Sequence, residues 1–448
     1  MADSTSFPLL THDAGERVAF WRKQAVDRET FLAHVRQLAA KLPEAPFAIN
    51  LCEDRYTFMT AISAAMIRGQ VTLLPPGRAS KLIEELAADY AGSYCLADAP
   101  TAVEGIDQHI VNLTDTDPPS GEEAVPQIPV NLTATIVFTS GSTGRPNPNP
   151  KRWGDLVVGL GLAKQRFGFQ SGKHETILAT IPPQHMYGLE VSIVLPLVAG
   201  LSVHAGHPFF PEDIRQAIST LPEPLTMFTT PTHLRACVES GLEWPRLSRI
   251  VSATAPLSAE LAERAETMFS CQVMEIYGCT EAGSLASRRT VDGDLWRFYD
   301  GISSHEQDHV VYVSASHLPD PVALNDFIEV KTESRFKLLG RHADLVNIAG
   351  NRASLSDLNL KLNAIEGVRD GVFVMPEGQV DEDVSRVAAL VVAPDLEKRD
   401  ILAALAERIN PVFLPRPLYK VDDLPRNAMG KLPREALSQL FEQLRKSS

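Results

Sequence analysis

Basic residues, cysteines and long apolar runs are all scarce in this chain of 448 residues. Its 42 Lys and Arg residues are outnumbered by 56 Asp and Glu residues, for a formal net charge of -14, which argues against broad binding to a nucleic acid backbone. The five cysteines contain no CxxC pair. Scattered cysteines of this kind predict reduced thiols in the core rather than a disulfide framework or a zinc site.

Features of a membrane anchor or a secretory signal are also missing. The first residues, MADSTSFPLL, lack a basic stretch followed by an apolar one. The most apolar segment, VSIVLPLVAGLSV at residues 191–203, is shorter than the ~20 residues that cross a bilayer. We therefore predict a cytoplasmic protein with no membrane span.

Segments with helical periodicity alternate with short apolar segments along most of the chain. Helices are predicted at residues 27–42, 58–69 and 258–269, and strands at residues 47–52, 71–76, 175–183, 225–231, 247–258 and 271–278. This alternation predicts an α/β fold with parallel sheets flanked by helices. From Gly340 onward the pattern favours a smaller α+β unit. We expect a large N-terminal domain over residues 1–339 and a small, mobile C-terminal domain over residues 340–448.

A loop rich in glycine and hydroxyl groups follows the strand predicted at residues 135–139. Residues 139–146 read TSGSTGRP. Glycines let backbone N–H groups turn inward and the hydroxyls add donors, an arrangement that favours an anion such as phosphate. The segment does not fit the GxxxxGK[ST] pattern, so a P-loop NTPase is disfavoured. Taken alone, a loop of this composition is more often a surface turn.

A second polar segment, EIYGCTEAG at residues 275–283, ends another predicted strand. Tyr277 offers an aromatic face for a base, Thr280 a hydroxyl for a phosphate, and Glu281 a carboxylate for a hard cation. The alternative for Glu281 is a helix N-cap neighbour that the helix dipole stabilises.

Two basic segments complete the pattern. Arg341 and Arg352 flank a turn where the small unit begins, and Lys431 follows a glycine near the C-terminus. A cation such as Lys431 can stabilise the charge that develops during transfer at a phosphate, and on a mobile domain it can enter and leave the site. The alternative for Lys431 is a solvated tail lysine.

Together these segments resemble the adenylate-forming superfamily, which includes acyl-CoA and aryl-CoA ligases, luciferases and the adenylation domains of peptide synthetases. The resemblance covers most of the chain and implies an N-terminal adenylation core, a mobile C-terminal domain, and ATP and Mg²⁺ as cofactors. The implied ATP- or AMP-binding residues are Thr139, Ser140, Gly141, Ser142, Thr143, Gly144, Ala255, Tyr277, Gly278, Asp326 and Arg341. The implied catalytic residues are Thr280, Glu281 and Lys431, with Glu281 as the Mg²⁺ ligand.

The chain departs from the family pattern at three places. The family has Lys-Gly after the phosphate loop, but this chain has NPNPKRW, so the loop lysine is either absent or displaced to Lys151. Asp326 stands 340 − 326 = 14 residues before Gly340, where the family has its ribose-binding aspartate, but within VALND instead of TGD. The family's acidic hinge residue is replaced by Ala343, next to Asp344.

The acid substrate is inferred from PPQHMYGLE at residues 182–190, which corresponds to the family's acid-pocket segment. Amino-acid-activating relatives have an aspartate here to pair with the substrate ammonium. This segment has none, which favours a small aromatic acid such as a hydroxybenzoic acid. The expected pocket residues are His185, Met186, Tyr187, Gly188, Ala253 and Thr254, with a core histidine as the alternative for His185.

The acceptor is predicted to be the phosphopantetheine thiol of an acyl carrier protein, with free coenzyme A as the alternative. The loop variant and the short chain resemble stand-alone acyl or aryl acid:carrier-protein ligases of bacterial aryl polyene-type pigment pathways. A local basic patch could dock an acidic carrier protein. Its candidate members are Arg352, Arg369, Arg416, Arg426, Arg434, Lys420 and Lys431.

Two further alternatives stay open at this point. One is a module that binds ATP or an acyl-adenylate without completing ligation, suggested by the altered loop and by Ala343. The other is an adenylating enzyme whose second half-reaction closes a β-lactone instead of forming a thioester.

Overall fold

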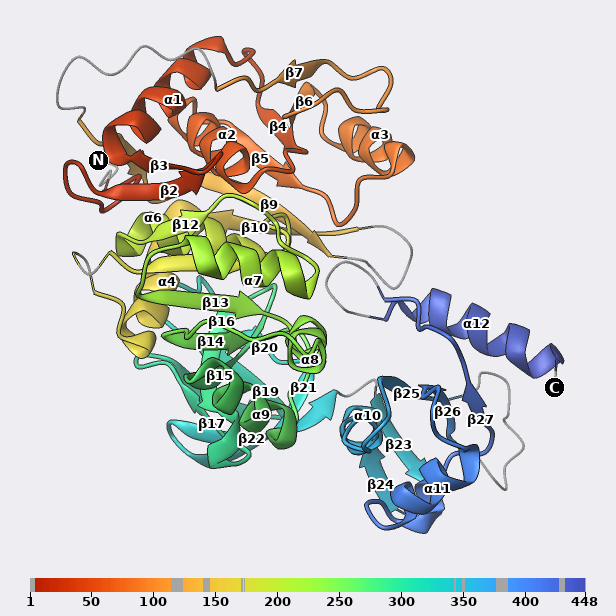
Figure 1. Ribbon diagram of the computed structural model, residues 1–448. Coiled ribbons are helices and arrows are strands. Elements are labelled where there is room, and N and C mark those ends of the chain that lie inside the picture. Colours follow the sequence, from red (N-terminus) through yellow and green to blue (C-terminus); the bar gives the residue numbers. More distant parts are fainter. Residues whose placement is uncertain are drawn as a thin grey trace.

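The computed structural model describes residues 5–113, 124–139, 146–170, 172, 174–341, 344–348, 351–375, 386–426 and 432–447. Within them lie two large sheets and a C-terminal part with its own small sheets. Figure 1 shows these three parts from top to bottom right, coloured from red through green to blue.

The first sheet is six-stranded, with strand order β10-β9-β5-β4-β6-β7. Its strands are β4 (Phe47–Asn50), β5 (Val71–Leu74), β6 (Ser93–Ala97), β7 (Gln108–Ile110), β9 (Thr133–Thr139) and β10 (Asn147–Arg152). The neighbouring strands are parallel except for β9 and β10. Helices α1 (Arg28–Lys41) and α2 (Arg55–Ile67) pack in one apolar cluster, and α3 (Ser80–Asp89) packs in another with β4 and β5.

The second sheet is eleven-stranded, with strand order β21-β22-β17-β16-β15-β14-β13-β11-β12-β2-β3. Its strands are β2 (Arg17–Trp21), β3 (Gln24–Asp27), β11 (Thr176–Ala179), β12 (Ser202–His204), β13 (Leu225–Thr229), β14 (Arg249–Ser252), β15 (Gln272–Cys279), β16 (Gly283–Arg289), β17 (Leu295–Phe298), β21 (Asp326–Thr332) and β22 (Arg335–Arg341). The run from β2 to β15 is parallel, and the run from β15 to β21 is antiparallel.

Helices cover both faces of this second sheet. They are α4 (Trp153–Phe167), α5 (Met186–Leu189), α6 (Leu195–Ala199), α7 (Pro211–Thr220), α8 (Pro231–Glu239) and α9 (Ala259–Phe269), with a π-helical turn at Glu190–Val194 between α5 and α6. The apolar residues of α4 and α6 belong to the main core, whereas those of α7, α8 and α9 form a separate cluster with β13 and β14. The predicted α/β architecture of helix-flanked sheets is confirmed.

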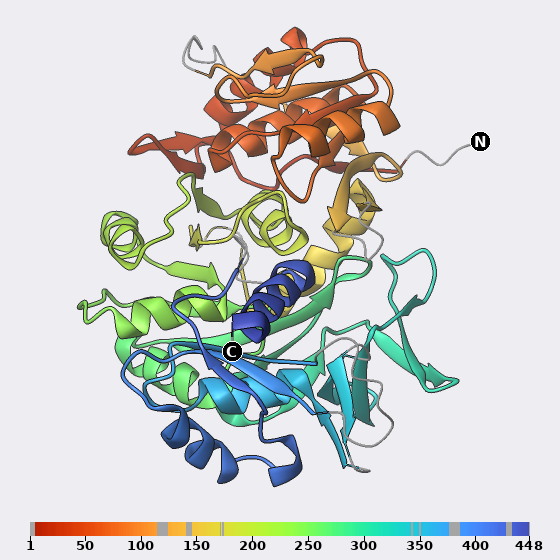
Figure 2. The same cartoon turned by 90° about the vertical axis from the view of Figure 1, so that its right-hand side faces the viewer.

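The C-terminal part has its own sheets and apolar clusters. Its elements are β23 (Leu345–Ile348), β24 (Asn351–Ser354), α10 (Leu355–Asn363), β25 (Asp370–Val374), β26 (Ala388–Val392), α11 (Lys398–Ala406), β27 (Leu418–Lys420) and α12 (Arg434–Ser447). Two apolar clusters include residues from this part alone. Turned by 90°, the molecule shows this part in front of the second sheet (Figure 2). These features support the predicted two-domain division, which stays a prediction.

The expected boundary at Gly340 falls inside a strand, since β22 continues to Arg341. Gly340 has φ +124°, and a Cβ built there would lie 2.2 Å from Ser354 Oγ. A side chain at this position would therefore be strained and would clash.

Three minor features complete the described chain. β1 (Ser6–Pro8) pairs with β8 (Gln127–Pro129), and β18 (Ser303–Gln307), β19 (Val310–Ser314) and β20 (Val322–Ala323) form a small sheet. Short 3₁₀ turns lie at Thr290–Asp292 and Pro411–Phe413. All five cysteines are free; Cys271 and Cys279 are partly exposed and the others are buried. Among the described residues, no helix has both the length and the apolar character of a membrane span.

Candidate functional site

The predicted phosphate loop joins two paired strands. Thr139 ends β9 and lies opposite Asn147, the first residue of β10. The loop residues Ser140, Gly141, Ser142, Thr143 and Gly144 lie outside the described residues. The register shows that both ends of the loop are held side by side at the edge of the first sheet, so the loop is closed by a β-hairpin.

The turn between β15 and β16 carries two of the predicted catalytic residues. Thr280 is partly exposed, and the Glu281 side chain is exposed. The element after Glu281 is the strand β16, so the alternative of a helix N-cap neighbour is wrong. The two strands approach closely here, because a Cβ on Gly278 would lie 2.2 Å from the Gly283 carbonyl oxygen. Glycine at position 278 therefore fits a structural requirement of the turn.

Three predicted nucleotide-binding positions meet beside this turn. Tyr277 Oη donates a hydrogen bond to Asp326 Oδ2 at 2.9 Å. Asp326 in turn lies opposite Arg341 in the β21–β22 pair. The Tyr277 ring packs edge-on against Trp296 and Phe336, with centroids 5.8 and 5.4 Å away. The antiparallel end of the second sheet thus gathers residues that are far apart in the sequence.

The predicted acid segment is also joined to its expected neighbours. Tyr187 Oη donates to the Val251 carbonyl at 2.9 Å, which ties the start of α5 to the end of β14. The next residues along from β14 are Ala253, which is buried, and Thr254, which has φ +79°. Positive φ is uncommon for a β-branched residue and costs ~1–3 kcal/mol, a kind of strain that clusters at functional sites.

Within the acid segment the described side chains differ in burial. His185 and Met186 are partly exposed, as is Ala255 beside Thr254, whereas Tyr187 and Gly188 are buried. A Cβ on Gly188 would lie only 1.9 Å from the Pro182 carbonyl oxygen. Gly188 therefore allows its backbone to approach Pro182 closely. Tyr187 belongs to the main apolar core, whereas His185 and Met186 remain partly exposed.

Sequence reasoning missed Arg55, which is completely buried in α2. Its guanidinium donates to the Ala179 and Ile181 carbonyls at 3.0 and 2.8 Å, and to two further carbonyls and a hydroxyl. Burial lowers the Arg55 pKa to about 10, so the side chain stays charged at neutral pH. Arg55 fixes the end of β11, from which the acid segment leaves. The sign of this role in the sequence is that Arg55 is a basic residue shortly before the apolar run FMTAISAAMI.

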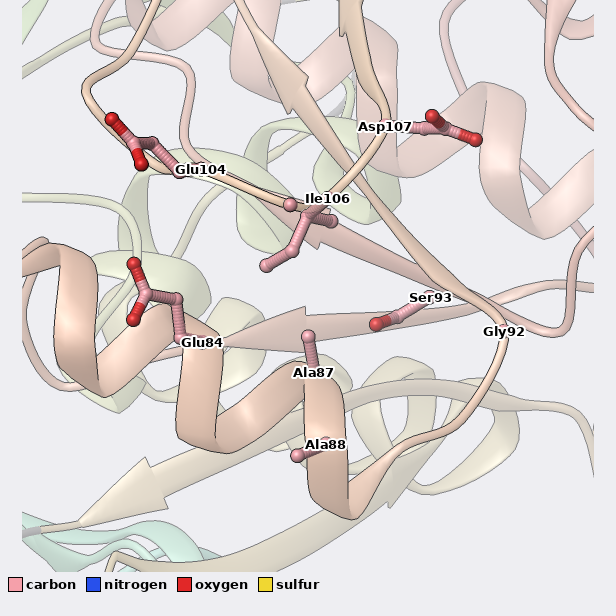
Figure 3. Close-up of a pocket in the computed structure, with 9 residues that line it drawn as sticks. Glu84, Ala87, Ala88, Gly92, Ser93, Glu104, Ile106 and Asp107 are labelled. Atoms are coloured by element: carbon pink, nitrogen blue, oxygen red, sulfur yellow. The ribbon is translucent and has the colours of Figure 1, made fainter.

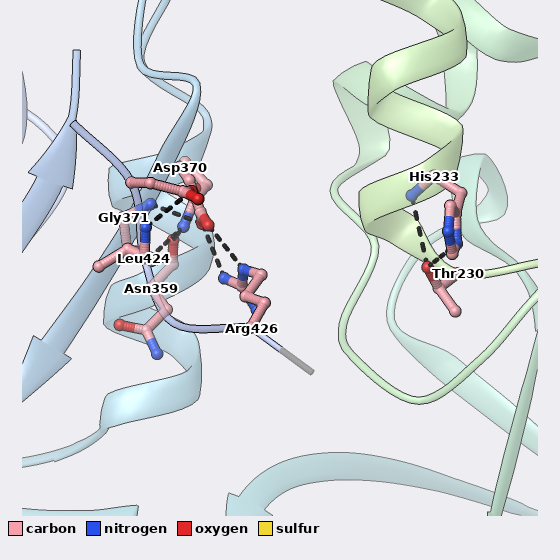
Figure 4. Close-up of polar contacts among 9 residues, drawn as sticks. Thr230, His233, Asn359, Asp370, Gly371, Leu424 and Arg426 are labelled. Atoms are coloured by element: carbon pink, nitrogen blue, oxygen red, sulfur yellow. Dashed lines mark hydrogen bonds and ion pairs between the residues drawn. The ribbon is translucent and has the colours of Figure 1, made fainter. Parts of the chain in front are cut away.

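Near the C-terminus, an ion pair fixes the chain just before the predicted catalytic lysine. Arg426 Nε and Nη2 donate to the two Asp370 carboxylate oxygens at 2.6 and 2.7 Å. Figure 4 shows this pair on one side and the Thr230–His233 pair at the start of α8 on the other. Lys431 itself lies outside the described residues.

Contacts in the C-terminal part bear on its placement and on the expected basic patch. Arg235 of α8 donates to the Asn363 carbonyl of α10 at 3.0 Å, linking the second sheet's helices to the C-terminal part. Arg369 is within 3.7 Å of Asp395, and Arg426 is paired with Asp370. At least two candidates for the patch are thus already engaged by carboxylates.

A cavity of about 450 Å³ lies elsewhere, between α3 and the segment before β7 (Figure 3). Its ionisable lining residues are Glu84, Glu104 and Asp107. Three carboxylates and no basic group would repel an anionic nucleotide. This cavity is therefore not part of the candidate site.

The chain is similar in sequence to known enzymes. The model of the AMP-binding enzyme family matches residues 43–304. The 4-coumarate–CoA ligase of Halorhodospira halophila is 26% identical over 312 residues, which cover 67% of this chain and 75% of that protein. A 2-succinylbenzoate–CoA ligase of Staphylococcus epidermidis is 25% identical over 335 residues, covering 67% of this chain and 69% of that one.

Solved structures share the fold over nearly the whole chain. ATP-bound MatB from Rhodopseudomonas palustris superposes with a TM-score of 0.81 at 18% identity, covering 96% of this chain and 97% of that one. The O-succinylbenzoate coenzyme A synthetase of Bacillus subtilis, in complex with ATP and magnesium ion, gives a TM-score of 0.78 at 19% identity, covering 94% and 96%. The family match spans more than half of the chain, and the chain therefore belongs to the AMP-binding enzyme family, within the adenylate-forming superfamily.

Proposed function

We propose that this protein uses ATP to activate a carboxylic acid as an acyl-adenylate and then transfers the acyl group to a pantetheine thiol. The observation that carries the proposal is the meeting of Tyr277, Asp326 and the Arg341 position beside the Thr280–Glu281 turn. An aromatic ring, a carboxylate and a guanidinium suit an adenosine, and the neighbouring turn suits its phosphates.

The proposed chemistry has two steps. An oxygen of the substrate carboxylate attacks the α-phosphorus of ATP, and the bond from that phosphorus to pyrophosphate breaks. A thiol sulfur, after losing its proton, then attacks the acyl carbon, and AMP leaves with the electrons of the acyl–oxygen bond. In the first step the protein must hold two anions, the substrate carboxylate and the triphosphate of ATP, in position for in-line attack. The phosphate-loop donors and Lys431 are proposed to meet this demand.

Glu281 is proposed to hold Mg²⁺. Mg²⁺ in nucleotide sites takes one or two carboxylates, substrate phosphates and water, so a single exposed carboxylate at the turn fits it. The ion would supply positive charge at the phosphates.

Replacing Glu281 by glutamine should raise the Mg²⁺ concentration needed for half-maximal activity about tenfold, because a neutral amide is a weaker ligand for a hard dication. A Mg²⁺ titration of acid-dependent ATP–pyrophosphate exchange measures this effect. Glu260→Gln, an exposed change in the first turn of α9, is the matched control and should leave the titration unchanged. An unaltered titration in the Glu281 variant would remove Glu281 from the metal site.

The acid is proposed to be a small aromatic one, such as a hydroxybenzoic acid. Three observations support this proposal. The acid segment has no aspartate that could pair with a substrate ammonium, and its Tyr187 is buried. Two relatives are named for 4-coumarate and 2-succinylbenzoate. We expect hydroxybenzoates to give at least about tenfold higher kcat/KM than palmitate or any amino acid in an exchange panel. Palmitate or an amino acid as the best substrate would contradict this assignment.

The acceptor is proposed to be coenzyme A, with an acyl carrier protein as the second candidate. The named relatives are CoA ligases, and two of the arginines proposed for a carrier-docking patch are paired with carboxylates. Thioester formation with coenzyme A and with a carrier protein at equal concentration, followed by mass spectrometry, separates the two. The aryl polyene pathway stays a prediction.

A further inference from the structure

Lys151 is a buried lysine whose ammonium contacts the turn that carries Glu281. It lies in β10, four residues after the strand begins at Asn147, and its relative exposure is 9%. Its Nζ donates to the Glu281 main-chain carbonyl at 2.8 Å. Lysines are rarely buried to this extent unless they are paired. At least one of the three ammonium donors is therefore used by the backbone of the turn.

Glu190 holds the same turn from another side. It begins the π-helical turn after α5, and its relative exposure is 6%. Its carboxylate accepts from the Ser284 amide at 3.1 Å and from Ser284 Oγ at 2.6 Å. Burial raises the Glu190 pKa and lowers the Lys151 pKa, and each charge opposes the shift in the other. Lys151 and Glu190 thus hold the Glu281 carbonyl and Ser284 of the same turn.

The turn between these contacts is tightly enclosed. Gly283 has φ +75°, and a Cβ there would lie 2.6 Å from Glu190 Oε1. The Glu281 carbonyl and the Ser284 amide are thus both fixed from the protein side. Glu281, in contrast, is an exposed residue. The backbone of this residue is therefore held from the protein side while the residue itself remains accessible.

We propose that Lys151 and Glu190 are positioning residues that hold residues 281–284 so that the Glu281 carboxylate is presented to Mg²⁺ and the nucleotide phosphates. Lys151 also ties β10, the strand that leaves the phosphate loop, to this turn. In this proposal Lys151 acts through the Glu281 backbone and does not take over the phosphate contact of the family's loop lysine. This inference rests on the proposed function of Glu281.

Lys151→Met tests the proposal, because methionine fills similar space without a charge or a donor. We expect the Mg²⁺ concentration for half-maximal ATP–pyrophosphate exchange to rise about tenfold, with kcat at saturating Mg²⁺ within about twofold of wild type, as for residues that orient a metal ligand. The matched control is Arg152→Met. Arg152 is the next residue of β10, and its side chain pairs with Asp155 instead of the turn. Its Mg²⁺ titration should equal that of wild type.

A double variant separates positioning from stability. Lys151→Met leaves Glu190 buried without its cation and should lower the melting temperature. Lys151→Met/Glu190→Gln removes that uncompensated charge, so the melting temperature should recover while the raised Mg²⁺ requirement persists. Recovery of both, or an unchanged Mg²⁺ titration in Lys151→Met, would overturn the proposal. A raised KM for ATP at saturating Mg²⁺ would instead make Lys151 a phosphate contact and would also overturn it.

A measurement without any acid distinguishes this failure from failure of the proposed function. The Mg²⁺ dependence of ATP binding can be followed by calorimetry in wild type, Lys151→Met and Arg152→Met. We expect only Lys151→Met to need about tenfold more Mg²⁺ for tight ATP binding. A shift here with no exchange for any acid would reject the ligase function and keep the positioning role, whereas equal curves for all three proteins would reject the positioning role.

Discussion

Replacing Lys431 by alanine is expected to lower acyl-adenylate formation about 100-fold or more, while ATP binding changes little. The reason is that this cation is proposed to stabilise charge that develops only in the transition state. The Arg426–Asp370 ion pair fixes the described backbone five residues before Lys431 in the sequence. Acid-dependent ATP–pyrophosphate exchange measures the loss, and calorimetry measures ATP binding.

Lys446→Ala is the matched control for this experiment. Lys446 is an exposed lysine in the last turn of α12, so its removal changes the net charge by the same amount. Its exchange rate should remain within about twofold of wild type, as expected for a screened surface charge. Full exchange activity in Lys431→Ala would exclude Lys431 from catalysis and would leave it as a solvated tail lysine.

Arg55→Met is expected to cause the largest loss of stability among single side-chain replacements near the site, about 4 kcal/mol or more. Five acceptors would lose a charged donor: the carbonyls of Ala179, Ile181, His204 and Gly206, and Ser192 Oγ. The Ala179 and Ile181 carbonyls and Ser192 Oγ are buried, so water cannot readily replace the lost donor there. The change in free energy of unfolding can be measured from the first cooperative transition in urea.

Arg68→Met provides the control, since it changes an arginine at the end of the same helix. Arg68 is paired with Glu44 at 2.8 Å, but Glu44 has 93% of its side chain exposed. A surface pair of this kind contributes at most about 1 kcal/mol. Equal losses for Arg55→Met and Arg68→Met would mean that the buried network does not hold the ends of β11 and β12.

The sequence predicts much of the fold because local patterns determine its helices and parallel strands. The helix expected at residues 27–42 forms at Arg28–Lys41, and Asp27 caps its N-terminus through the Thr30 amide. Strands expected at residues 47–52 and 225–231 form at Phe47–Asn50 and Leu225–Thr229. In each case the apolar residues that define the predicted element are buried in the folded protein. The local pattern and the tertiary packing therefore agree.

The antiparallel half of the second sheet was harder to foresee. The strands β16, β17, β21 and β22 are rich in charged residues, such as Arg288, Arg289 and Lys337, and lack a clear apolar alternation. They are stabilised by long-range contacts, including the Arg288–Glu275 ion pair at 2.6 Å. Local periodicity carries no information on such pairs.

The sequence predicts the members of the candidate site that lie within contiguous motifs. It does not predict contacts between residues that are far apart in the chain. TSGSTGRP and YGCTE identify their own residues. The spacing of Asp326 predicts a ribose contact, which stays a prediction, but does not predict its hydrogen bond with Tyr277. The sequence identifies Lys151 only as a displaced loop lysine, since its contact with Glu281 bridges 130 residues of sequence and depends on the tertiary fold.

The most direct test of the proposed function is to identify the products that the wild-type protein forms from ATP, Mg²⁺ and a hydroxybenzoic acid in the absence of a thiol. The account predicts acyl-adenylate and pyrophosphate in equal amounts, detected by mass spectrometry after rapid quenching, and conversion of the adenylate to a thioester and AMP when coenzyme A is added. Formation of ADP and phosphate, or ATP binding without pyrophosphate release for any acid in the panel, would contradict it.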